Sequence, residues 1–232
     1  MKKIIIIHGW TYTTDTWNAL KNELRAAGYE PTLLTVPGLT ETTDSVWTLD
    51  GYVEWLKEQL TTSEDAVILG HSNGGRIALA FALAYPQKIK FLILMDSAGI
   101  YHNGLPIRLK RILFGALAAV GRKITSSETL RRALYTLSGE SDYKNASPLM
   151  RQTMTNLIAV DLAPRLHEIT APTLIIWGGE DTITPVADGE LMHQAIKTSE
   201  LFIIKDARHS PHSTHARQVS TKILSTLRHY DI

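Results

Sequence analysis

The chain alternates short apolar runs with longer amphipathic stretches along most of its length. The short runs are rich in isoleucine, leucine and valine, and they predict strands because β-branched side chains favour extended backbone. Stretches whose apolar residues recur three or four positions apart predict helices between them. The predicted strands are residues 3–7, 31–36, 65–70, 90–95, 172–177 and 200–204, and the predicted helices are 14–27, 47–60, 74–85, 187–196 and 215–229.

Strands separated by helices are typical of parallel βαβ units with right-handed crossovers. We therefore expect an α/β fold with a six-stranded, all-parallel sheet flanked by helices. Such a sheet leaves an edge that a helix, a loop or a partner must cover. An edge-to-edge homodimer is for this reason worth testing.

Residues 99–168 interrupt the alternation, since they contain no strand pattern and are rich in helix-forming residues. Helices are expected near 105–121, 127–137 and 148–162. A long insertion in a compact fold is normally functional. The expected organisation is a core of residues 1–98 and 169–232 with a helical cap or lid at 99–168. Apolar side chains of the cap either attach it to the core or line a substrate pocket.

One motif, Gly70-His71-Ser72-Asn73-Gly74, joins the third predicted strand to the helix after it. A strand that runs straight into a helix turns sharply, which strains the central residue and pushes its side chain out of the sheet. The two glycines let neighbouring backbone approach closely because they lack a Cβ. The Ser72 hydroxyl would stand at a helix N-terminus, where N–H groups favour developing negative charge. The motif therefore predicts a nucleophilic serine.

A serine nucleophile needs a base, an acid that orients the base, and donors for an oxyanion. The later strands supply candidates, since Asp181 follows the run at 172–177 and His209 follows the run at 200–204. Both lie just beyond the carboxyl end of a strand, where ligands bind in open parallel sheets. Glu180 and Asp96, which ends the strand at 90–95, are alternatives for the acid.

This order of serine, aspartate and histidine resembles the α/β-hydrolase superfamily over nearly the whole chain. The stretch Ile4 to Trp10 resembles the strand and His-Gly oxyanion turn of that superfamily, and His209-Ser210-Pro211-His212 resembles its H-x-P-H segment. The resemblance implies that Ser72 is the nucleophile, Asp181 the acid and His209 the base. It also implies that the backbone N–H groups of Trp10 and Asn73 form the oxyanion hole. Compared with the superfamily the sheet is reduced, because the first strand leads at once into the oxyanion turn.

The expected function is that of a serine esterase, which cleaves a small ester through an acyl-serine intermediate. The same residues also serve thioesterases, amidases and C–C bond hydrolases. A ligand receptor that uses a hydrolase-type pocket is an alternative from another class, and multiple turnover would distinguish the two.

The composition of the chain excludes several other kinds of protein and of binding site. The chain has 232 residues and a net charge of +1, which gives no electrostatic reason to bind nucleic acid. It contains no cysteine, which excludes disulfides and thiolate metal sites and is compatible with a reducing compartment. Its apolar runs are too short to cross a bilayer, and its histidines show no metal-binding spacing. We expect a cytoplasmic enzyme without metal or cofactor and without stable membrane insertion, acting on a small acyl substrate.

Overall fold

The computed structural model describes residues 2–60, 65–102 and 146–232. Their six strands form one sheet of order β2-β1-β3-β4-β5-β6, in which every neighbouring pair is parallel. The strands are β1 (Lys2–Ile7), β2 (Tyr29–Leu33), β3 (Ala66–His71), β4 (Ile89–Met95), β5 (Thr173–Gly178) and β6 (Ser199–Ile204). The predicted six-stranded, all-parallel sheet is confirmed.

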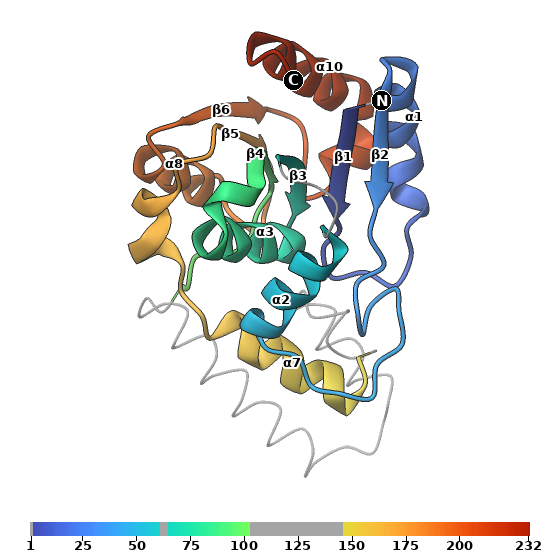
Figure 1. Ribbon diagram of the computed structural model, residues 1–232, viewed down its shortest axis with the longest axis vertical. Helices are drawn as coiled ribbons and strands as arrows, with labels where there is room; N and C mark the ends of the chain where they lie inside the picture. Colours follow the sequence, from blue (N-terminus) through green and yellow to red (C-terminus); the bar gives the residue numbers. More distant parts are fainter. Residues whose placement is uncertain (1, 61–64, 103–145) are drawn as a thin grey trace.

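Helices cover both faces of this sheet (Figure 1). On one face lie α1 (Asn18–Ala26) and α10 (Ala216–His229), and on the other lie α2 (Leu49–Gln59), α3 (Asn73–Ala84) and α8 (Val186–Ala195). The shorter elements are η1 (Asp15–Trp17), η2 (Pro86–Lys88), η3 (Ala163–Glu168), α7 (Pro148–Ile158) and α9 (Pro211–Thr214). The predicted helices outside the insertion are thus present, with ends that differ by a few residues.

The isoleucine run of β1 shows why the strands read as continuous apolar segments. Ile4 and Ile6 are buried against α1 and α10, whereas Ile5 and Ile7 are buried against α2 and α3. Successive side chains of a strand point to opposite faces, so a sheet covered on both faces needs apolar residues at every position.

The second strand begins and ends earlier than the predicted 31–36. The Leu34 N–H still donates to the Ile6 carbonyl oxygen of β1 at 3.0 Å, but the Val36 N–H donates to Thr40 Oγ1 at 2.9 Å instead. Pro31 is tolerated within β2 because this edge strand pairs only with β1 and does not need every N–H. Apolar residues of the loop thus extended the pattern beyond the strand.

The predicted helices at 105–121 and 127–137 lie outside the described residues, but α7 confirms a helix in the third predicted stretch. The Ser147 side chain caps it by accepting a bond from the Met150 N–H at 3.2 Å. At its other end, buried Arg76 of α3 donates to the carbonyl oxygens of Leu157 and Val160 at 2.7 and 2.8 Å. The described part of the insertion is therefore fastened to the core, and the division into core and cap stays a prediction.

Within the described part of the chain, no helix combines the length and the apolar character that crossing a membrane requires.

Candidate active site

Ser72 lies between β3 and α3. Its backbone angles, φ 53° and ψ −119°, form a conformation that residues other than glycine rarely adopt. Its N–H donates to the Met95 carbonyl at 3.1 Å, and its carbonyl oxygen accepts bonds from Gly75 at 3.0 Å and Ala98 at 2.9 Å. A strained conformation persists only where its surroundings fix it, and these bonds do so. The predicted strained turn is present.

Glycines allow the close packing around this turn. A Cβ on Gly74 would lie 2.1 Å from the Ile7 carbonyl oxygen, and a Cβ on Gly70 would lie 2.6 Å from that of Gly74. A Cβ on Gly9 would lie 2.8 Å from the Cβ of Ser72. The turn after β1 is therefore packed directly against the serine, and no larger residue fits at these positions without a shift of the backbone.

The structure brings Ser72, His209 and Asp181 together at the carboxyl edge of the sheet. His209 Nε2 lies 2.9 Å from Ser72 Oγ, and His209 Nδ1 lies 2.7 Å from Asp181 Oδ2. Because a carboxylate accepts hydrogen bonds, Nδ1 carries the ring proton and Nε2 presents its lone pair to the serine hydroxyl. This is the arrangement that a general base needs in order to take the serine proton.

Asp181 is buried and its oxygens are fully engaged. Oδ1 accepts bonds from the N–H groups of Ile183 at 2.8 Å and Thr184 at 3.1 Å, while Oδ2 accepts from the Thr184 hydroxyl at 2.8 Å. Burial alone would raise the pKa of this carboxyl, but the hydrogen bond and charge of His209, with these donors, outweigh it and lower the pKa. Asp181 is therefore ionised at neutral pH.

The two alternative acids do not face His209 in this way. Asp96 is buried, and its Oδ1 accepts a bond from the Gly178 N–H at 2.7 Å, while its Oδ2 has no partner among the described residues. Burial raises the pKa of Asp96 to about 8, so the group is largely neutral at pH 7. Glu180 is exposed and lies 3.7 Å from the Arg208 guanidinium.

The segments that carry the two predicted oxyanion donors adjoin the serine. Asn73 opens α3, so its N–H has no carbonyl four residues earlier in the helix. Trp10 follows Gly9 in the turn packed on Ser72. Among the described residues, Trp10 Nε1 and Asn73 Nδ2 are also buried without a partner. Unpaired buried donors are costly, and such donors suit a site that receives a polar substrate.

His8 lies in the turn after β1, and both of its ring nitrogens are hydrogen-bonded. Its Nδ1 lies 2.8 Å from the Gly9 carbonyl oxygen and its Nε2 lies 2.8 Å from Thr40 Oγ1. Burial lowers the pKa of His8 despite the bond to Gly9, so its ring is neutral. The ring ties the turn to the loop after β2.

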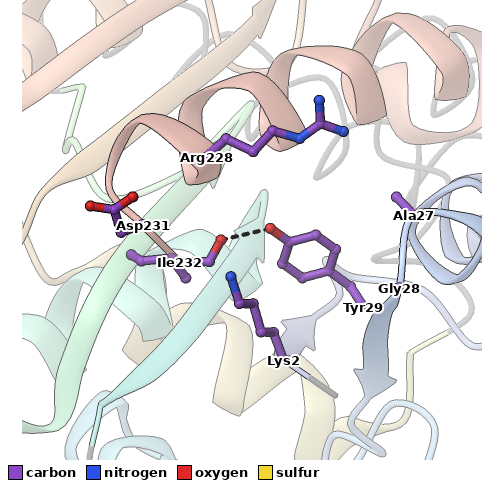
Figure 2. A pocket seen from close by; sticks show the side chains of 7 residues that line it. All are labelled: Lys2, Ala27, Gly28, Tyr29, Arg228, Asp231 and Ile232. Carbon is purple, nitrogen blue, oxygen red and sulfur yellow. Dashed lines mark hydrogen bonds between the residues drawn. The ribbon is translucent and has the colours of Figure 1, made fainter.

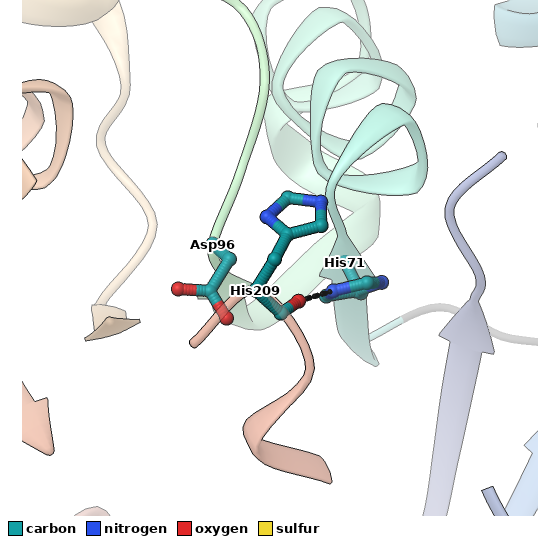
Figure 3. Close-up of side chains that lie close together, drawn as sticks. All are labelled: His71, Asp96 and His209. Carbon is teal, nitrogen blue, oxygen red and sulfur yellow. Dashed lines mark hydrogen bonds between the residues drawn. The ribbon is translucent and has the colours of Figure 1, made fainter. Parts of the chain in front are cut away.

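His71, Asp96 and His209 place potential metal ligands within 4.8 Å of one another (Figure 3). Both ring nitrogens of His209 are already engaged with Ser72 and Asp181, and His71 Nε2 is hydrogen-bonded to the His209 carbonyl. The ring nitrogens that bring these side chains together thus already take part in the hydrogen-bond network of the site.

A cavity of about 510 Å³ lies at the amino ends of β1 and β2 (Figure 2). Lys2 and Tyr29, which line it, open β1 and β2, whereas Ser72 follows the end of β3. The Tyr29 hydroxyl donates to the Ile232 carbonyl oxygen at 2.7 Å across this cavity. The cavity is therefore separate from the serine.

Two residues of the site were missed in the sequence. Thr184 is the third residue after Asp181, a spacing at which a hydroxyl and an N–H reach back to an acidic side chain. His71 occupies the variable position before the serine, and nothing in the pattern indicates that its ring contacts the His209 loop.

The parallel sheet and the strained serine turn define a protein of the α/β-hydrolase class. The chain belongs to the alpha/beta hydrolase fold family, whose model matches residues 2–216.

The relatives are named as hydrolases of different substrates. The chain is 27% identical to a pimeloyl-[acyl-carrier protein] methyl ester esterase of Neisseria meningitidis serogroup C, over 93% of this chain and 90% of that protein. It is 25% identical to a 2-hydroxy-6-oxononadienedioate/2-hydroxy-6-oxononatrienedioate hydrolase of Dechloromonas aromatica, over 99% and 88%. The crystal structure of MGS-MChE2, an alpha/beta hydrolase enzyme from a lagoon-sediment metagenome, superposes with a TM-score of 0.75 at 19% identity, covering 100% of this chain and 92% of that one.

Proposed function

We propose that this protein is a serine hydrolase that cleaves small carboxylic esters through an acyl-serine intermediate. The observation that carries the proposal is the hydrogen-bond chain from Ser72 Oγ through His209 to Asp181, with distances of 2.9 and 2.7 Å. The chain starts at a serine that the strained turn presents at the carboxyl edge of the sheet.

In the first step Ser72 Oγ bonds to the acyl carbon while its proton passes to His209 Nε2. The electron pair of the carbonyl moves to its oxygen, and the N–H groups of Trp10 and Asn73 donate to this oxyanion. The Asp181 carboxylate stabilises the imidazolium cation that His209 becomes. Loss of one oxyanion donor typically lowers turnover by about 10²–10³.

In the second step the bond between the acyl carbon and the leaving oxygen breaks, and His209 gives its proton to that oxygen. The alcohol departs and the acyl group stays on Ser72. Water then attacks the acyl carbon as His209 takes a proton from it. Collapse of the second oxyanion releases the carboxylic acid and returns the proton to Ser72 Oγ.

The esterase relative supports an ester substrate, and its coverage of nearly the whole chain favours the same bond type here. The relative from Dechloromonas aromatica, named as a hydrolase of an oxo-dienedioate, makes C–C bond hydrolysis the second candidate. Both reactions use an acyl-carbon attack, and the pocket contents would decide between them.

The test is steady-state hydrolysis of p-nitrophenyl esters of increasing acyl length, with a thioester of the preferred acyl group measured beside them. Turnover is expected in the wild type and in Ser213→Ala, which removes an exposed hydroxyl close to His209 in sequence. Ser72→Ala is expected to abolish it. Unchanged hydrolysis in Ser72→Ala would contradict the serine mechanism, and stoichiometric labelling by a fluorophosphonate without multiple turnover would favour a receptor.

A further inference from the structure

His71 links the segment that bears the serine to the loop that bears the histidine. It is the last residue of β3, it is buried, and its Nε2 lies 2.7 Å from the carbonyl oxygen of His209 (Figure 3). A carbonyl oxygen only accepts hydrogen bonds, so Nε2 carries the proton of the His71 ring. The residue beside the nucleophile thus holds the backbone of the base.

The ring of His71 is held in place by other rings. His212 of α9 lies 4.6 Å from it in an edge-on arrangement, and Trp17 of η1 stacks on His212 at 4.0 Å. The backbone of the turn after β1 is also close to the ring, since a Cβ built on Gly9 would lie 3.1 Å from His71 Nδ1. The packing leaves the ring little freedom, so its Nε2–H has a fixed direction.

The ring is also neutral. Burial, with the nearby His212, His209 and His8, holds the pKa of His71 well below its usual range, and the bond to the His209 carbonyl only partly opposes this. Burial and the charge of His209 likewise lower the pKa of His212 to about 3. His71 and His212 are therefore neutral when His209 becomes a cation.

The backbone around His209 explains why such a bond matters. His209 lies in the segment between the end of β6 at Ile204 and the start of α9 at Pro211, outside any strand or helix. Its ring must meet Ser72 Oγ and Asp181 Oδ2 at the same time. A misplacement of about 1 Å in such a constellation can lower turnover about 10²-fold.

We infer that His71 is a positioning residue, whose Nε2–H bond to the His209 carbonyl keeps the His209 ring aligned between Ser72 and Asp181. This inference rests on the proposed function. Since His71 and Ser72 are adjacent, one short segment sets the place of both the nucleophile and the base.

The test compares His71→Phe, which keeps a ring but has no donor, with His71→Gln, whose amide nitrogen reaches the region of Nε2. His212→Phe is the matched control, because it preserves a ring on Trp17 without touching the bond to His209. For His71→Phe we expect kcat on a p-nitrophenyl ester, and the rate of fluorophosphonate labelling, to fall about 10- to 100-fold with KM little changed. The kcat of His71→Gln and of His212→Phe should stay within several-fold of the wild-type value. His71→Gln restores a hydrogen-bond donor, and His212→Phe keeps the ring packing without changing the bond to His209.

Equal losses in His71→Phe and His71→Gln would overturn the inference, as would a loss in His212→Phe as large as that in His71→Phe. Should His71→Phe fail to fold, histidine-ring NMR of the wild type decides. A His71 ring that carries its proton on Nε2 supports the inference, and a neutral ring with its proton on Nδ1, which leaves no donor toward the His209 carbonyl, contradicts it. An inactive wild type would refute the proposed function instead, and the NMR result would still test the geometry.

Discussion

Replacing Asp181 by asparagine tests the role of the acid with almost no change in size. Asp181 Oδ1 accepts two backbone N–H bonds, from Ile183 and Thr184, so the oxygen of an asparagine amide must occupy that position. Its NH₂ group then faces His209 Nδ1, where the wild type has an accepting oxygen 2.7 Å away. Two donors cannot face each other, so the ring proton of His209 moves to Nε2.

A proton on Nε2 removes the lone pair that would accept the Ser72 proton. The corresponding substitution in a serine triad lowers kcat by about 10⁴, equivalent to about 5.4 kcal/mol of transition-state stabilisation. We therefore expect a loss of about that size in kcat for a p-nitrophenyl ester, with the fold intact by circular dichroism.

Asp96→Asn is the matched control. Its amide oxygen can still accept the Gly178 N–H, and its NH₂ group replaces the hydroxyl of an acid whose pKa is about 8. We expect kcat at pH 7 to stay within about tenfold of the wild type, since neutral residues of equal shape are exchanged. A larger loss in Asp96→Asn than in Asp181→Asn would contradict the role of Asp181 and make Asp96 the acid.

Two further predictions concern stability and packing. Folding raises the pKa of Asp96 from 3.8 to about 8, so the folded state binds more protons between these values. The unfolding free energy of the wild type minus that of Asp96→Asn should therefore fall as pH rises from about 4 to 8, by at most about 1.4 kcal/mol per pH unit, and denaturant titrations showing no fall would contradict the neutral acid. Gly9→Ala places a Cβ 2.8 Å from that of Ser72; we expect a lower kcat and a loss of about 1–3 kcal/mol in urea unfolding, and a variant with both unchanged would show that the turn is not packed on the serine.

The strands and their parallel order could be predicted because each strand is buried on both faces and reads as an apolar run. The end of β2 could not, since the loop residue Val36 is also apolar and buried, although its N–H donates to the Thr40 side chain and not to a neighbouring strand. An apolar pattern indicates which residues are buried, and residues beyond the end of a strand can be buried as well.

In the site, too, some features follow from the sequence pattern and others depend on contacts between distant residues. Ser72, Asp181 and His209 could be found because each follows a predicted strand, and parallel strands bring such positions to one edge. The contact of His71 with the His209 carbonyl spans 138 positions in sequence and depends on ring packing, which no local spacing encodes. The neutral state of Asp96 likewise depends on its burial beside Asp181.

Rapid-quench mass spectrometry of the enzyme during turnover of a p-nitrophenyl ester tests the acyl-serine intermediate directly. An acyl-serine mechanism predicts that the peptide containing Ser72 gains the mass of the acyl group, that the adduct forms within the burst of p-nitrophenol release, and that it decays as the acid appears. Hydrolysis without an adduct on Ser72, or with the acyl group on another residue, would contradict it.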